Sequence, residues 1–182
     1  MRLETISIGA YRSGRTRRKE EFMKKSIMVI GLIFIVSCWA VFAAGPQAGP
    51  KLVPLDLSKA SDSFPVVMQA PEGATAADDF GNVLVKKGAN FQVEVSSSAK
   101  DIESLKKEIK ANTLNKLKAF LVETADALLY ESTVMGKSEF HFVANVKAGG
   151  TTFGAEDTKG PVYNRADAEL MLKCFQTLTA KK

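Results

Sequence analysis

The stretch ALLYESTVMGKSEFHFVANVK, residues 127–147, decides the fold. Two apolar runs, 127–134 and 139–147, flank a turn that contains Gly136, which is typical of a β-hairpin. In the second run every other residue is apolar, which predicts a strand with one buried face. The residues of that face are Phe140, Phe142, Ala144 and Val146.

Further strands are predicted on both sides of this hairpin. Gly149-Gly150 forms the next turn, and 151–157 is the strand that follows it. Upstream, 81–87 and 90–96 flank Gly88 as a second hairpin. An apolar run at 64–69 ends in a turn, and 51–57 reads as an edge strand because Pro54 has no N–H for a ladder.

Two helices are predicted between and after these strands. The first opens with Ser98-x-x-Asp101 in the manner of a capping box and carries apolar residues at mostly helical spacing from Ile102 to Phe120, so we expect it to end near Lys118. Asn164 caps the second, with Asp167 at its third position. The apolar stripe of this last helix contains Leu170, Cys174 and Leu178.

This order of elements predicts the α+β class. We expect an antiparallel sheet with an amphipathic central helix and a C-terminal helix packed on it, in an α/β/α sandwich-like arrangement. Residues 51–182 make one domain, and 44–50 (AGPQAGP) reads as a linker because it is rich in proline, glycine and alanine.

The element order over 64–180 resembles the PsbP-like family, whose domains are antiparallel sheets between helices. Phe64-Pro65 and the Pro71-Glu72-Gly73 turn are compatible with that resemblance, and no functional motif matches. The resemblance implies an exported binding or accessory domain and assigns no site residue.

The positive charge of the chain lies in its N-terminal segment. Residues 1–43 carry eight basic and three acidic side chains, whereas 44–182 carry 17 of each. Because the domain is neutral, we expect no nucleic-acid partner. Five lysines at 106, 107, 110, 116 and 118 are expected on the solvated side of the first helix.

Residues 1–43 are interpreted as an N-terminal extension followed by a signal peptide. Lys24-Lys25 and the apolar run from Ile27 have the form of an export signal, and we expect translation to start at Met23. The codons of Lys19-Glu20-Glu21 could then serve as a ribosome-binding sequence; the alternative is a long, translated basic region. Whichever way the signal is processed, its basic residues should stay in the cytoplasm, so we expect the domain to be exported to the periplasm or the extracellular space.

Three fates of the signal remain open. Val41-Phe42-Ala43 resembles a cleavage site, with the cut between Ala43 and Ala44. Ile35-Val36-Ser37-Cys38 resembles a lipobox, in which Cys38 would carry the lipid. Residues 27–44 are also just long enough for an uncleaved anchor. Any membrane contact is therefore expected only through the leader or through a lipid on Cys38.

Candidate site residues in the domain are few. His141, the only histidine, shares a strand face with Glu139, and such a pair could transfer a proton. We expect His141 to lie half-exposed at the surface, with Glu139 and His141 as weak candidates for a surface site. An acid paired with His141 in a hollow shielded from water would instead favour an enzyme.

The remaining motifs are interpreted structurally. Cys174 is expected in the core, Asp78-Asp79 and Glu156-Asp157 as solvated loop acids, and Gly136-Lys137-Ser138 and Asp79-Phe80-Gly81 as turns. We expect no catalytic residue, cofactor or metal. The functional hypothesis is a non-enzymatic exported domain that binds an unknown protein or small molecule. The alternatives are a structural lipoprotein at the membrane surface and a small hydrolase-type enzyme.

The leader gives the first testable prediction. Mass spectrometry of the mature chain should find a free N-terminus at Ala44, because small residues precede the cut and the apolar run continues past Cys38. A diacylated Cys38 would contradict cleavage and establish the lipoprotein.

Overall fold

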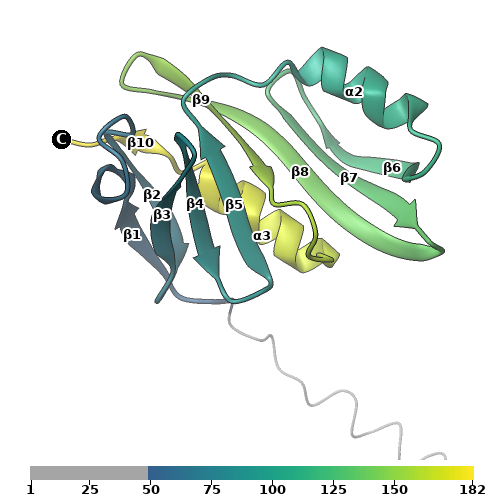
Figure 1. Ribbon diagram of the computed structural model, residues 1–182, viewed down its shortest axis with the longest axis horizontal. Helices are drawn as coiled ribbons and strands as arrows, with labels where there is room; N and C mark the ends of the chain where they lie inside the picture. The colour runs from purple at the N-terminus through teal and green to yellow at the C-terminus, as the bar shows by residue number, and fades with distance from the viewer. Residues whose placement is uncertain (1–48) are drawn as a thin grey trace, which may run out of the picture. The chain divides into compact units, whose positions relative to one another are not determined.

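The computed structural model describes residues 49–182, and the predicted signal segment, Cys38, Ala43 and Ala44 lie outside this range. The described residues contain two antiparallel sheets (Figure 1). The larger sheet has seven strands in the order β3-β4-β5-β9-β8-β7-β6, and the smaller has three in the order β1-β2-β10. The α+β class is therefore correct.

The elements follow one another along the chain with short connections. Their bounds are β1 Leu52–Asp56, the 3₁₀ turn η1 Leu57–Lys59, β2 Val66–Pro71, β3 Thr75–Asp79, β4 Asn82–Lys87, β5 Phe91–Ser96, α2 Ile102–Ala111, β6 Lys116–Glu123, β7 Ala127–Val134, β8 Lys137–Ala148, β9 Thr151–Asp157, α3 Arg165–Phe175 and β10 Thr179–Ala180.

The two helices cover opposite faces of the large sheet. α3 packs against β8 and β5 of the large sheet and against β2 of the small one, and Met171 and Phe175 are fully buried there together with Phe142. α2 lies over β6 and β7 (Figure 1), where Ile102 packs with Leu128 and Val143. Neighbouring residues of a strand point to opposite faces, so Phe142 and Val143 belong to different cores.

Several expectations from the sequence are confirmed. β7 and β9 have the predicted bounds, and Pro54 lies in the edge strand β1. Asn164 is the N-cap of α3 as predicted, and it forms a capping box with Asp167 at the third helical position. Phe80 and Gly81 both have positive φ, at 51° and 89°, which suits the tight turn of the β3–β4 hairpin.

The predicted extent of the first helix is wrong. α2 ends at Ala111, because the side chain of Asn112 accepts hydrogen bonds from the backbone N–H groups of Leu114 and Asn115 and turns the chain. Residues 116–123 then form the strand β6. Two register shifts in its pairing with β7 break the alternation of the strand, so its apolar spacing resembled a helix.

Three smaller corrections follow from the same region and from the ends of the domain. Asp101, not Ser98, is the N-cap of α2, since its carboxylate accepts from Ser104 N. The lysines at 116 and 118 lie on β6 and not with the others on α2. β3 and the two-residue β10 were not predicted; β3 holds the alanine-rich run TAADD, which has low β-propensity.

A close contact fixes the start of α2 over the sheet. Gly154 of β9 lies under the chain before α2, where an added Cβ would come within 2.7 Å of Ser98 O and 2.8 Å of Lys100 Cγ. Asn145, the β8 partner of Gly154, accepts from Lys100 N and donates to Lys100 O. The middle of β8 and β9 therefore holds residues 98–100, and it does so through contacts with the backbone of these three residues.

This contact predicts the effect of a single methyl group. Gly154→Ala should destabilise the domain by about 1–3 kcal/mol in urea unfolding, because the Cβ would push against backbone atoms. Gly49→Ala is the control, since no atom lies within 4 Å of its added Cβ. Equal stability of the two variants would show that residues 98–100 do not lie over β9.

Candidate functional site

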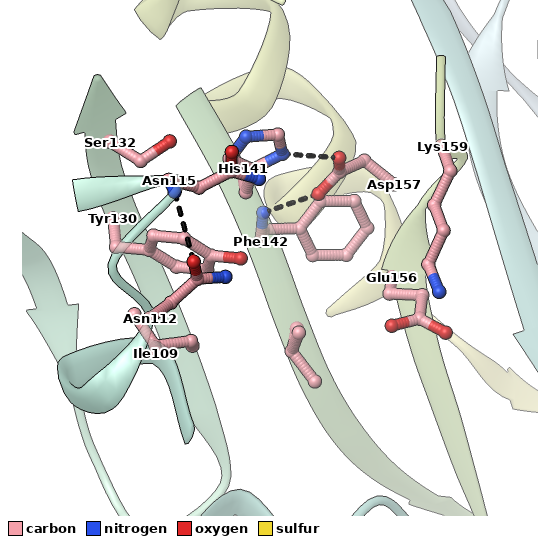
Figure 2. Close-up of a pocket in the computed structure, with 11 residues that line it drawn as sticks. Ile109, Asn112, Asn115, Tyr130, Ser132, His141, Phe142, Glu156, Asp157 and Lys159 are labelled. Carbon is pink, nitrogen blue, oxygen red and sulfur yellow. Dashed lines mark hydrogen bonds and ion pairs between the residues drawn. The ribbon is translucent and has the colours of Figure 1, made fainter. Parts of the chain in front are cut away.

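A hollow of about 210 Å³ opens between the C-terminal end of α2 and the large sheet. Figure 2 shows polar side chains from several elements around it. Its lining residues are Ile109, Asn112, Asn115, Tyr130, Ser132, His141, Phe142, Val143, Glu156, Asp157 and Lys159.

The sheet itself makes room for the polar groups. β9 pairs with β8 only as far as Glu156, which lies opposite Val143, while Asp157 still pairs with Val93 of β5. The first half of β8 thus loses its neighbour on one side. The N–H groups of β8 that lose their partner in β9 need other acceptors, because a buried N–H without an acceptor is costly.

Asp157 supplies one of these acceptors with its side chain. Its Oδ1 accepts from Phe142 N at 2.7 Å, and its Oδ2 lies 2.8 Å from His141 Nδ1 (Figure 2). Phe140 N, the next N–H of β8 without a partner in β9, donates to Tyr163 O. One carboxylate therefore both ends the ladder and fixes the imidazole.

This contact decides the tautomer of His141. A carboxylate only accepts hydrogen bonds, so Nδ1 is the donor. In the neutral ring Nε2 then carries a lone pair, and it becomes a donor only after protonation. The nearest charged group to Nε2 is Glu139 Oε2 at 3.8 Å, beyond hydrogen-bond distance.

Opposing effects act on the pKa of His141. Burial lowers the pKa, but the hydrogen bond with Asp157 and the negative charges of Asp157 and Glu139 together outweigh burial. The pKa of His141 therefore lies above its ordinary value of 6.5. At neutral pH a larger fraction of the ring is therefore protonated than in an exposed histidine.

Tyr130 lies beside His141 on the neighbouring strand β7. The two rings have centroids 5.2 Å apart and are tilted by 35°. Burial and the nearby charges of Asp157 and Glu156 raise the pKa of the Tyr130 phenol well above its ordinary value. The phenol therefore stays neutral and can both donate and accept a hydrogen bond.

Ser132 contributes a buried hydroxyl without a partner. The residue is 2% exposed, and no described residue makes a hydrogen bond with its Oγ. Buried hydroxyls nearly always find a partner, and leaving one unpaired costs about 1–3 kcal/mol. Ser132 lies in the wall of the hollow, and its Oγ is enclosed there without a partner.

The site corrects two sequence expectations and adds one residue that the sequence did not indicate. Glu156-Asp157 are not solvated loop acids, since Asp157 is 9% exposed and hydrogen-bonded and Glu156 forms an ion pair with Lys100 at 2.8 Å. His141 is largely buried, with a side chain 21% exposed, and is not half-exposed. The sequence reasoning missed Asp157 as the partner of His141 because the two residues lie on different strands.

The other candidates fall outside the hollow or add nothing to it. Cys174 is buried in the core as expected, and burial raises the pKa of its thiol to about 11. Gly136 forms the predicted turn between β7 and β8. Within residues 49–182 no cluster of three histidine, cysteine or acidic side chains could hold a metal ion, and no helix is long and apolar enough to cross a membrane.

Comparisons of the chain with protein-family models, with curated proteins and with solved structures give no match.

The contact with Asp157 makes a prediction about pH. The stabilisation from protonated His141 should be fully present below pH 6.5 and be lost as the pH rises through the raised pKa of the folded state. NMR titration of the only histidine should give a pKa above 6.5. Asp157→Asn should lower this pKa. Burial still lowers the pKa in this variant, and one of the two carboxylates that raise it is gone.

Glu139→Gln is the matched control for this titration. It should lower the pKa of His141 less than Asp157→Asn, since Glu139 acts only through its charge from 3.8 Å. An unchanged pKa in Asp157→Asn would contradict the account.

Proposed function

We propose that this chain is an exported, non-enzymatic binding domain whose ligand site is the hollow beside His141. The leader supports export across the cytoplasmic membrane, to the periplasm or the extracellular space. The neutral charge of 44–182 supports a ligand or partner other than nucleic acid.

One observation carries this proposal: the hollow holds an imidazole that Asp157 orients, so that the ring nitrogen away from Asp157 is left for a ligand. Apolar groups from Ile109 and Val143 line the same space. A concave site with apolar walls and a few placed polar groups is the usual form of a small-molecule site. Its 210 Å³ suit a ligand smaller than those that fill the usual pockets of about 300–1,000 Å³.

The placement of the helices supports a finer description of the fold. α2 and α3 on opposite faces of the large sheet agree with an α/β/α sandwich-like arrangement, which we propose together with the PsbP-like relationship. That relationship implies an accessory or binding role, in line with the hollow.

The pair Asp157–His141 favours a second candidate, a small hydrolase-type enzyme. A carboxylate that orients an imidazole is one half of a nucleophile-activating set, and Ser132 is the serine in the lining of the same hollow. A base must however come within about 2.6–3.2 Å of the proton that it takes, and Ser132 Oγ makes no hydrogen bond with any described residue. We therefore place binding first.

A fragment screen tests the proposed site. Neutral and charged small-molecule fragments should shift the NMR signals of Tyr130, Ser132 and His141 in a saturable way, and Ser132→Val should abolish the shifts by filling the hollow. Ser63→Val is the matched control, since Ser63 is exposed and lies outside the lining. Unchanged spectra with every fragment would contradict a ligand site.

The same variants separate binding from catalysis and from structure. Ser132→Ala should be at least as stable as the parent chain, because it removes a hydroxyl that has no partner. Thr177→Val should lose about 1 kcal/mol, since the hydroxyl of Thr177 bonds with Cys174 O and Gln69 N. Hydrolysis of p-nitrophenyl acetate that is lost in Ser132→Ala would overturn the non-enzymatic assignment.

A further inference from the structure

We propose that the ligand of this hollow is a small uncharged molecule with several hydroxyl groups, a polyol or a monosaccharide. This inference rests on the proposed function and names the class of ligand. It follows from the charges, the hydrogen-bonding groups, the walls and the size of the hollow.

The charges that line the hollow are mostly paired inside the protein. Glu156 forms an ion pair with Lys100 at 2.8 Å, and Asp157 is occupied by His141 Nδ1 and Phe142 N. A cationic ligand would have to compete for these carboxylates. An anionic ligand would meet the same two carboxylates with Lys159 as the one lysine in the lining. An uncharged ligand avoids both costs, because it neither competes for these carboxylates nor is repelled by them.

The free polar groups both donate and accept hydrogen bonds. The hydroxyl of Tyr130 has both capacities, and the side-chain amide of Asn115 has a donor and an acceptor end. Nε2 of neutral His141 accepts. A ligand hydroxyl also donates and accepts, so several hydroxyls on one small molecule can match such a set, whereas a ligand with acceptors alone would leave Nε2 unpaired.

The walls of the hollow supply apolar surface for the carbon atoms of the ligand. Ile109 comes from α2 and Val143 comes from β8, so carbon surface from two elements faces the polar groups. A monosaccharide ring carries hydroxyls at its edge and C–H groups on its faces. Burial of those faces contributes about 25 cal/mol per Å² of apolar surface removed from water.

The single histidine provides the experiment. Glycerol, glucose and galactose are titrated separately into the mature protein. At least one of them should shift the ring signals of His141 saturably and lower the pKa of His141. The reason is that a bound uncharged ligand displaces water from beside the ring, and the loss of water disfavours the protonated form. The affinity should therefore weaken on acidification, about tenfold for each unit by which the ligand lowers the pKa. Glu139, Asp157, Tyr130, Glu156 and Lys159 are the other charged or titratable groups near this ring or in the lining.

Two variants and two charged probes complete the test. Tyr130→Phe should bind the sugar or polyol about 2- to 10-fold more weakly, since it removes one hydroxyl and keeps the ring. Ser132→Val should abolish binding, and Ser63→Val should leave it unchanged. Neither charged probe should bind saturably at physiological salt. Acetate should therefore not raise the pKa of His141, and ethylammonium should not lower it.

Each other result decides between the two levels of the proposal. Saturable binding of acetate or ethylammonium without any sugar or polyol would overturn the ligand class and keep the site. Fragments that bind while all three hydroxylated probes fail would do the same. The absence of binding by every probe and fragment would overturn both.

Discussion

The carboxylate of Asp157 is the interaction on which the rest of the site depends. β9 leaves β8 after Glu156, and the two oxygens of Asp157 take over at that point, one accepting from Phe142 N and one from His141 Nδ1. Without this acceptor the sheet would have to close or leave an N–H unpaired. The carboxylate thus allows a hollow at the side of an otherwise continuous sheet.

The surroundings keep this arrangement in place. Asn145 and Gly154 hold the chain before α2 close to the sheet, and α2 then supplies one wall of the hollow. On the opposite face Phe142 is buried with α3, so the same residue that donates to Asp157 is anchored in the larger core. The result is a polar site whose backbone cannot shift without loss of packing on both faces.

The sequence predicted what depends on local order and missed what depends on pairing. The strands β7 and β9 and the capping box of α3 follow from alternation and from side chains three residues apart. The strand β6 was not predicted, because two register shifts in its pairing with β7 disturb the alternation of its apolar residues. His141 and Glu139 share a face as expected, but the hydrogen-bond partner of His141, Asp157, comes 16 residues later from another strand. No spacing rule within one strand could have joined them.

The tautomer of His141 tests this account most directly. Two-dimensional ¹H–¹⁵N NMR of the ring at high pH distinguishes a protonated Nδ1 from a protonated Nε2 in the neutral imidazole. The account predicts the Nδ1–H form in the parent chain, because Asp157 can only accept, and loss of this preference in Asp157→Asn. A neutral ring protonated at Nε2 in the parent chain would contradict it.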